Sequence, residues 1–296
     1  MFFKRSIPFV VHGRVSSIAG ENPQGETTPL PVIRLVYSGP LARPGVRVAV
    51  IVHLFYPELI DEIHDFLQNI LEPFDLFVTT PHEGAIADIF NRFSSLDQTV
   101  TIALSENRGR DIGPFISLYR KKLLETYDAV LKVHGKKSTY SHKGDFWRRR
   151  LFTELCGDAI VVKSTLEMLR QGSVGIVGPQ NDYLTHKRFW GGNKACVKNL
   201  LMAACENSSN DSTLGFFAGS MFWFKPEALS LLHNIQEDQL HFEPEAGQQD
   251  GTLAHALERI FCDLARRKNY VVTSIDANGV DVGLMNTKKN IVPVLN

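Results

Sequence analysis

The chain has 296 residues, of which 44% are hydrophobic and 22% charged, so it can bury one large α/β core or two small ones, and intrinsic disorder is excluded. Lysine plus arginine and aspartate plus glutamate both number 32, so no overall positive field exists to attract nucleic acid or an anionic membrane. We therefore expect no nucleic-acid partner, and any basic function must be local.

Residues 1–45 are expected to form an extended N-terminal arm, because residues 12–45 are rich in glycine, proline, serine and glutamate around one candidate strand at 32–37. A single domain of residues 46–296 follows. Its first part alternates continuous apolar runs with segments of helical periodicity. The expected strands are 47–55, 74–80, 100–104 and 128–133, and the expected helices are 57–71, 85–93 and 112–124.

The second part of the domain continues with a helix at 146–171 and a strand at 173–178. It then passes through a polar, glycine-rich segment to an apolar strand at 215–224. A helix from about Pro226, a helix at 252–267 and a last strand at 270–275 complete the pattern. Strands that alternate with helices predict an α/β fold with a doubly wound, mainly parallel sheet, which binds its ligands beyond the carboxyl ends of the strands.

One candidate binding loop follows the third of these strands. It contains Glu106, Asn107, Arg110 and Asp111 with two glycines. Glycines let a backbone approach a ligand, and arginine pairs with phosphate oxygens, so the loop can bind a nucleotide or a sugar. The alternative is a self-satisfied turn in which Asp111 only caps the next helix.

A second, basic loop follows the fourth strand and holds His134, Lys136 and Lys137. These side chains can offset the charge of a leaving nucleoside diphosphate. For the nearby run Arg148–Arg150, a solvated basic helix face is the expected role.

Carboxylates gather before the helix at 252–267, where Glu243, Glu245 and Asp250 stand. Glycosyl transfer with inversion needs a base for the acceptor hydroxyl, and Asp250 is the candidate. Its alternative role is the N-cap of that helix. His255, expected on the exposed side of the helix, is a second catalytic candidate, although such a histidine is often structural.

The small residues Ala218, Gly219 and Ser220 interrupt the apolar strand at 215–224. Glycine in a strand often marks a place where a ligand approaches the backbone closely. We therefore expect this segment to contact the acceptor.

Six segments follow one another in the order of the motifs of the rhamnan synthesis protein F family, which the chain resembles over roughly residues 48–261. They are VAVIVHLFYPELIDEI, FDLFVTT, ENRGRDIGPF, YDAVLKVHGKKS, FFAGSMFWFKPEAL and QQDGTLAHALERIF. The resemblance implies a GT-A-like αβα sandwich and a glycosyltransferase. It would transfer rhamnose or a related hexose from a nucleotide sugar to a cell-surface polysaccharide or O-antigen. Residues 46–145 would then bind the nucleotide sugar, and residues 146–296 would form the acceptor and catalytic half.

In the layout that the resemblance implies, HGKKS stands where a metal-binding Asp-x-Asp pair is expected, and no such pair is present there. Mg²⁺ and Mn²⁺ held against a diphosphate prefer carboxylate ligands. We therefore expect no metal site, no essential divalent metal and no permanently bound cofactor. The implied donor is dTDP-rhamnose or a UDP-sugar, and the implied acceptor is a polysaccharide or a lipid-linked glycan.

Two other functions stay open. The first is a noncatalytic glycan-binding or assembly scaffold that works beside other polysaccharide-synthesis enzymes. The second is a nucleotide-sugar hydrolase or pyrophosphorylase, against which the missing acidic pair argues mildly.

The cysteines and the hydropathy predict the compartment. Cys156, Cys196, Cys205 and Cys262 form no CxxC pair, so we expect reduced core thiols. The apolar run near the start is too short for a signal peptide, and no stretch of about 18 uncharged apolar residues occurs. We expect a cytoplasmic protein, with at most peripheral association at the inner face of the membrane.

Overall fold

The computed structural model describes residues 30–38, 45, 47–96, 98–135, 137, 143–205 and 214–284. The strands are β1 (Ile33–Ser38), β2 (Val48–His53), β3 (Phe74–Thr80), β4 (Thr99–Ser105), β5 (Ala129–His134), β6 (Val174–Pro179), β7 (Tyr183–Leu184), β8 (Phe216–Phe217), β9 (Phe222–Phe224) and β10 (Val271–Ile275). The α-helices are α1 (Ile60–Leu67), α2 (Ile86–Phe93), α3 (Ile112–Arg120), α4 (Lys143–Cys156), α5 (Ala159–Arg170), α6 (Lys194–Ala204) and α7 (Leu253–Arg267). The longer 3-10 segments are η5 (Lys187–Asn193) and η6 (Pro226–Asn234).

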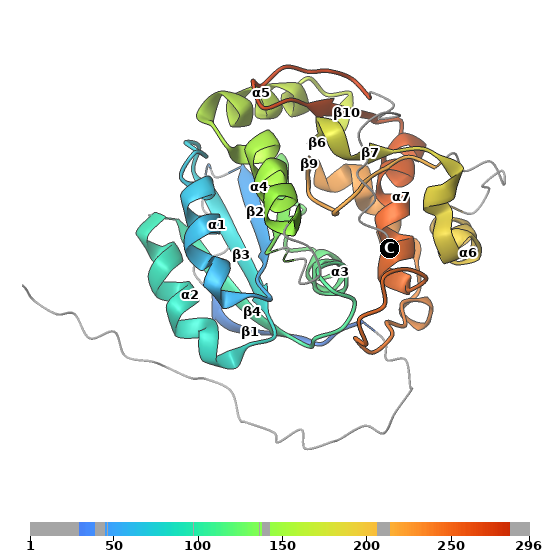
Figure 1. Cartoon of the computed structure of the whole chain (residues 1–296), viewed down its shortest axis with the longest axis horizontal. Helices are drawn as coiled ribbons and strands as arrows, with labels where there is room; N and C mark the ends of the chain where they lie inside the picture. Colours follow the sequence, from blue (N-terminus) through green and yellow to red (C-terminus); the bar gives the residue numbers. More distant parts are fainter. Residues whose placement is uncertain are drawn as a thin grey trace, which may run out of the picture.

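One eight-stranded sheet forms the centre of the molecule, in the order β1-β4-β3-β2-β5-β9-β6-β10 (Figure 1). Strands β2 to β5 are mutually parallel, and so are β6 and β10. Strand β9 runs antiparallel between β5 and β6, and β1 runs antiparallel along β4. The expected α/β fold with a mainly parallel sheet is confirmed.

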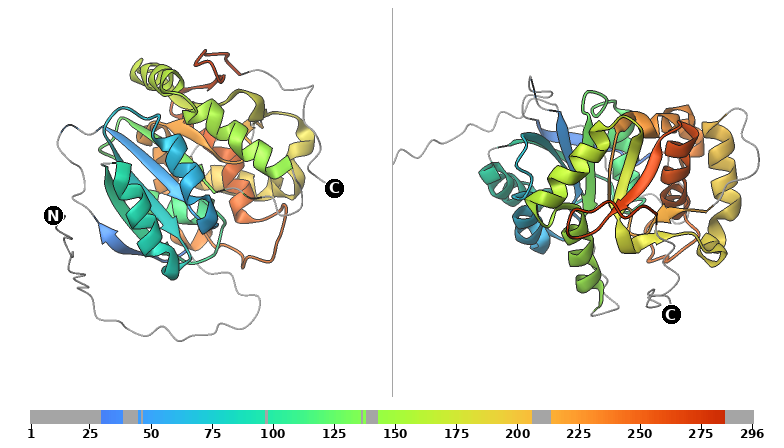
Figure 2. Two further views of the ribbon diagram at one scale, coloured as in Figure 1. Left: turned by 60° about the vertical axis from the view of Figure 1, so that its left-hand side comes forward. Right: turned by 90° about the horizontal axis from the view of Figure 1, so that it is seen from above.

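Helices cover both faces of the sheet, as Figures 1 and 2 show. One apolar layer packs α1, α2, α4 and α5 against one face of the strands, and the other packs α3, α6, α7 and η6 against the opposite face. Every residue of β2, β3 and β5 is buried, because a parallel strand with helices on both sides has no solvated face. The αβα sandwich is therefore built from two cores that share one sheet.

Part of the expected N-terminal arm belongs to this sheet. The candidate strand at 32–37 is β1, which pairs with β4 from Ile33 opposite Ser105 to Ser38 opposite Thr101. Residues 1–29, 39–44 and 46 lie outside the described residues.

The single helix expected at 146–171 is wrong, because the structure has two helices, α4 and α5. Gly157 separates them, and a Cβ atom there would lie 2.6 Å from the Cα atom of Thr153. Asp158 is extended, with φ −151°, and its side chain accepts a hydrogen bond from the amide of Ile160. This N-cap starts a new helix in a new direction.

Candidate functional site

The last residues of the parallel strands meet at one edge of the sheet. His53 ends β2 and lies in register with His134 at the end of β5 and with Thr79 near the end of β3. Strand order reverses between β2 and β5, which is where open α/β sheets bind ligands. The loops after β4 and β5, both expected to bind the donor, leave the sheet at this edge.

Lys132 in β5 is the buried cation of the site. Its ammonium group donates to Asp111 Oδ2 at 2.5 Å, to the Ser220 carbonyl at 2.7 Å and to Ser220 Oγ at 2.8 Å. This contact joins the loop after β4 to the turn before β9. Sequence reasoning missed Lys132, although a lysine inside a continuous apolar strand is a signal that could have identified it.

Asp111 does not cap α3, which corrects one of the expectations for this residue. It has helical backbone angles and makes no side-chain capping bond. Burial alone raises the pKa of Asp111, but the charges of His134 and Lys132 outweigh burial and hold the pKa well below its usual range. The carboxylate therefore stays ionised as the partner of Lys132.

The expected strand at 215–224 is broken by a turn at residues 218–221, between β8 and β9. Gly219 and Ser220 have φ angles of +90° and +55°, which no strand accommodates. His134 Nε2 lies 2.7 Å from the Gly219 carbonyl, and Glu258 accepts a hydrogen bond from the Gly219 amide at 2.9 Å. Gly219 and Ser220 are buried, and Ala218 is half-buried, so the part of the expected acceptor segment nearest to solvent is Ala218.

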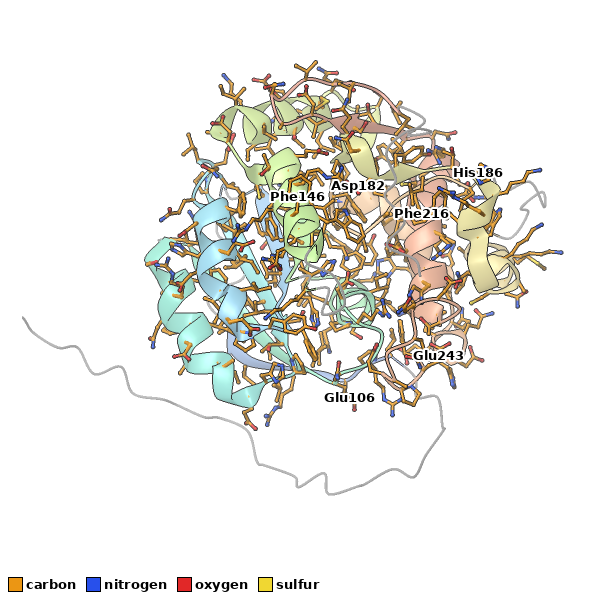
Figure 3. The ribbon with its side chains drawn as sticks, in the orientation of Figure 1. Glu106, Phe146, Asp182, His186, Phe216 and Glu243 are labelled. Carbon is orange, nitrogen blue, oxygen red and sulfur yellow. The ribbon has the colours of Figure 1, made fainter. Side chains whose placement is uncertain are left out.

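The loop after β4 folds against the segment before α7. Arg108 forms an isolated bridge with Pro244, and the Arg110 amide donates to Glu245 Oε1 at 2.9 Å. The Arg110 guanidinium donates to the Gln248 carbonyl. Figure 3 labels Glu106 and Glu243 on these two neighbouring segments. The structure thus brings two stretches of polar residues together that are about 135 positions apart in the chain.

Asn107 and Glu106 lie on the exposed side of this loop. The Glu106 carboxylate accepts a hydrogen bond from the amide of Val32 at 3.4 Å, which ties the loop to the start of β1.

Asp250 is held by groups from two other segments. Its carboxylate accepts hydrogen bonds from the Gly192 amide at 2.8 Å, from Asn193 Nδ2 at 2.5 Å and from Arg259 at 3.2 Å. Burial alone raises its pKa, and these partners outweigh burial and lower the pKa. The side chain is still 37% exposed, so an ionised carboxylate faces solvent at this edge. Arg259 was not predicted as a site residue from the sequence, because its pairing with Asp250 depends on the fold.

The N-cap of α7 is Thr252 and not Asp250, which corrects the alternative role considered for Asp250. Thr252 and His255 form a capping box, in which His255 Nδ1 lies 2.7 Å from Thr252 Oγ1. His255 is only 8% exposed, which corrects its expected place on the exposed side of the helix. Burial, together with the charges of Arg110 and Arg259, lowers the pKa of His255 to about 4. The imidazole is therefore neutral at neutral pH.

His53 is also neutral, since burial lowers its pKa to about 3 from 6.5. Because this pKa is lower in the folded chain than in the unfolded chain, the unfolded chain takes up the proton first as the pH falls. We expect the free energy of unfolding to fall below pH 6.5 by up to about 1.4 kcal/mol per pH unit for this histidine. Urea unfolding between pH 8 and about pH 4.5 measures the slope.

His53→Gln should make this slope shallower without abolishing it, because glutamine does not titrate while His255, whose pKa is also lowered, still does. His186→Gln, at an exposed histidine, serves as the control and should keep the wild-type slope. An unchanged slope in His53→Gln would show that other groups cause the acid sensitivity.

The basic side chains after β5 take different positions. Lys136 lies outside the described residues. Lys137 is exposed and pairs with Glu58 at 2.7 Å. Arg148 was expected on a solvated helix face, and this prediction is wrong: the side chain is buried and donates to both oxygens of Glu62 at 2.9 and 3.0 Å. Arg148 therefore fastens α4 to α1.

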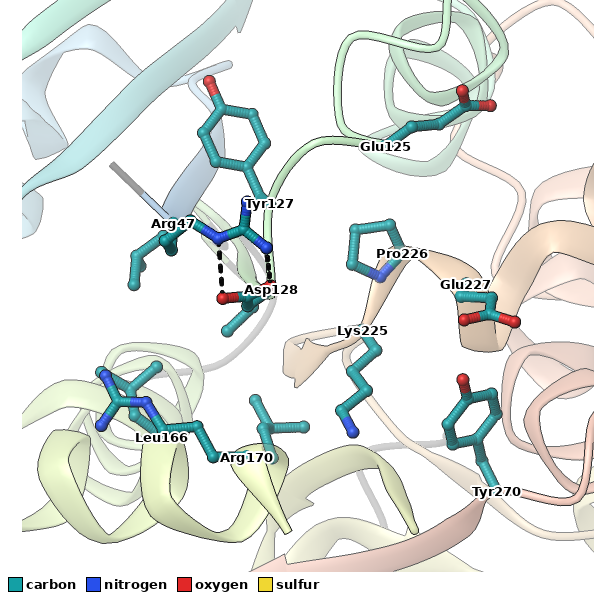
Figure 4. Close-up of a pocket in the computed structure, with 13 residues that line it drawn as sticks. Arg47, Glu125, Tyr127, Asp128, Leu166, Arg170, Lys225, Pro226, Glu227 and Tyr270 are labelled. Atoms are coloured by element: carbon teal, nitrogen blue, oxygen red, sulfur yellow. Dashed lines mark hydrogen bonds and ion pairs between the residues drawn. The ribbon is translucent and has the colours of Figure 1, made fainter. Parts of the chain in front are cut away.

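A pocket of about 490 Å³ opens at the other edge of the sheet, near the amino ends of β2 and β5 (Figure 4). Arg47 and Asp128 form an ion pair at its wall. Lys225 and Tyr270 face it from the opposite side. This pocket lies away from the carboxyl ends of the strands, so we place the candidate site at the edge described above and not here.

The described residues contain neither a cluster of metal-ligating side chains nor a helix that could span a membrane. No group of three or more histidine, cysteine, aspartate or glutamate side chains suitable for a metal ion occurs among them. Within the same parts of the chain, no helix is both long and apolar enough to cross a membrane.

Two solved structures with similar folds have low TM-scores and low sequence identities to this chain. A mycobacterial protein has a TM-score of 0.38 at 13% identity, over 88% of this chain and 78% of that chain. Glucosyl-3-phosphoglycerate synthase from Mycobacterium tuberculosis, in complex with Mn²⁺, UDP and glucosyl-3-phosphoglycerate, has a TM-score of 0.36 at 11% identity, over 82% and 73% of the two chains.

Sequence comparisons are more specific. The uncharacterized protein WxcX of Xanthomonas campestris pv. campestris strain B100 is 33% identical over 231 residues, 77% of this chain and 32% of WxcX. WxcX of a second strain of the same pathovar is 32% identical over the same shares. The chain thus spans about a third of the length of these curated relatives. The model of rhamnan synthesis protein F matches residues 34–270, and the chain belongs to the rhamnan synthesis protein F family.

Proposed function

We propose that the chain is a glycosyltransferase that moves rhamnose or a related hexose, with inversion, from a nucleotide sugar to a cell-surface polysaccharide or O-antigen acceptor. The observation that carries the proposal is the family match over residues 34–270. The site supports it, because the glycine-containing turn at 218–221 contacts the end of β5 where strand order reverses, and the exposed Asp250 carboxylate belongs to the segment that contacts the loop after β4. We propose that it works at the cytoplasmic face of the membrane, beside other enzymes of polysaccharide synthesis.

The donor, dTDP-rhamnose or a UDP-sugar, is proposed to bind along the exposed side of the loop after β4. Asn107 and the Arg110 guanidinium face solvent there and can hydrogen-bond to phosphate oxygens. Lys136 and Lys137 are proposed to offset the charge of the leaving diphosphate. Asp111 and His134 lie behind this surface, so we assign them the support of the donor loop and of the turn at 218–221.

Asp250 is the proposed base for the acceptor hydroxyl. The carboxylate is ionised at neutral pH and its side chain is 37% exposed, so an acceptor hydroxyl can reach it; its partners lower its pKa and thereby weaken it as a base. The acceptor is proposed to approach Ala218, and His255 is proposed to support this region through its capping box with Thr252.

A ligand-induced thermal shift tests the donor and the metal together. We expect one of dTDP-rhamnose, UDP-glucose, UDP-galactose or GDP-mannose to stabilise the chain in the presence of a chelator. At about one hundred times the dissociation constant, the ligand should add about 2.7 kcal/mol to the free energy of unfolding. The matching free nucleoside diphosphates report how much of this gain comes from the sugar.

Each outcome has a separate meaning. A shift that appears only with Mn²⁺ would overturn the expectation that no divalent metal is essential and would leave the transferase proposal in place. If none of these ligands shifts the unfolding temperature under either condition, a noncatalytic glycan-binding scaffold becomes the better explanation.

A further inference from the structure

Lys132 is buried at a position where an apolar residue would fit. It is 1% exposed, and its ammonium group lies 5.3 Å from the ring centre of Phe115 and 6.0 Å from that of Phe222. Its neighbours in β5, Leu131 and Val133, are apolar and buried in the opposite layer. Burying a charge is costly unless the charge is paired and hydrogen-bonded. The position of Lys132 is therefore best explained by the groups that its ammonium holds.

Those groups come from two segments of the candidate site. A lysine ammonium has three N–H donors, and here one reaches Asp111 and two reach the carbonyl and hydroxyl of Ser220. Asp111 belongs to the loop after β4, which is 21 positions before Lys132, and Ser220 follows 88 positions after it. One buried charge thus connects the proposed donor side to the proposed acceptor side.

Ser220 needs such a connection, because its backbone is strained. Its φ of +55° lies in the left-handed region, which serine rarely adopts and which persists only when the surroundings hold it. His134 and Glu258 hold the adjacent Gly219 from β5 and α7. Lys132 holds the strained residue directly, because its ammonium group donates to both the carbonyl oxygen and the hydroxyl of Ser220.

We propose that Lys132 is a positioning residue of the glycosyl-transfer site, which fixes the turn at 218–221 relative to the loop that carries Asp111. This inference rests on the proposed function. Lys132 does not touch the substrate. It sets the distance between the two substrates, and small errors in that distance are costly for catalysis.

A charge-neutral double variant separates positioning from stability. Lys132→Met alone leaves the buried Asp111 carboxylate with only the more distant His134 imidazole, at 3.8 Å, as a cationic partner, and we expect the Tm to fall by about 10 °C. Adding Asp111→Asn removes the unpaired charge and should restore most of that loss. Neither variant restores the hydrogen bonds to Ser220.

The double variant should therefore recover Tm without recovering function. We expect amide exchange in the peptide spanning 216–222 to stay about tenfold faster than in the wild type. With the nucleotide sugar that gives the largest thermal shift, kcat should stay about a hundredfold reduced. If exchange and kcat return together with Tm, Lys132 serves only the stability of the fold and the proposal is wrong.

Ser220→Ala provides a second, milder test that decides the question if the double variant does not fold. It keeps the Lys132–Asp111 pair and removes one of the two hydrogen bonds to Ser220. Faster exchange at 216–222 with a lower kcat supports positioning, and wild-type values of both contradict it. The exchange measurement needs no substrate, so a wild-type chain without turnover would count against the proposed transferase and would leave this test intact.

Discussion

Replacing Asp250 by asparagine is expected to reduce sugar transfer by about 10²–10⁴-fold while binding of the nucleotide sugar persists. Asparagine keeps the size of the side chain but cannot take the proton of an acceptor hydroxyl. The measurement is single-turnover transfer together with the donor-induced thermal shift, in the wild type and in Asp250→Asn.

Asp250 also holds neighbouring groups by hydrogen bonds, and this structural role must be separated from its proposed role as a base. Its carboxylate also holds Gly192, Asn193 and Arg259, so a lost contact could move η5. Amide exchange over 187–193 reports such a movement. Asp88→Asn, at an exposed position on α2, is the control for the substitution itself and should keep full transfer. Full transfer in Asp250→Asn would instead assign the base to another group.

Replacing Arg148 by methionine should lower the free energy of unfolding by about 3 kcal/mol. The Arg148 side chain is 2% exposed and donates to both oxygens of Glu62 and to Asp145. Methionine fills much of the space but leaves Glu62, which is 19% exposed, without its main partner. Urea unfolding at neutral pH measures the loss.

Arg149→Met is the matched control, because Arg149 contacts the same carboxylate from the surface. Its side chain is 66% exposed and lies 3.4 Å from Glu62. Exposed ion pairs contribute little, so we expect a loss below about 1 kcal/mol. Equal losses in the two variants would show that burial of Arg148 does not decide the strength of this contact.

The turn at 218–221 does not follow from the local sequence, because Glu258 and His134 hold it from other elements. The residues Phe216, Phe217 and Phe222–Phe224 are apolar enough to predict one continuous strand, and β8 and β9 are indeed strands. The turn between them depends on a carboxylate from α7 and an imidazole from β5. Local periodicity does not contain those partners.

The sequence by itself determined the alternation of strands and helices, the mainly parallel sheet and the edge at which the polar loops meet. The reason is that β2, β3 and β5 are buried on both faces and read as continuous apolar runs, while α1 and α2 show apolar residues at helical spacing. Because parallel strands end at a common edge, the loops after β4 and β5 were placed correctly from order alone.

Only the tertiary structure decided which polar groups pair at that edge. Asp111 and Asp250 both precede helices, and the sequence offered each a capping role. In the fold, Asp111 meets Lys132, and Asp250 meets Asn193 and Arg259. Each of these buried or half-buried charges takes the partner that packing brings within hydrogen-bond distance. Such partners come from distant parts of the chain, so no local pattern around either aspartate could reveal them.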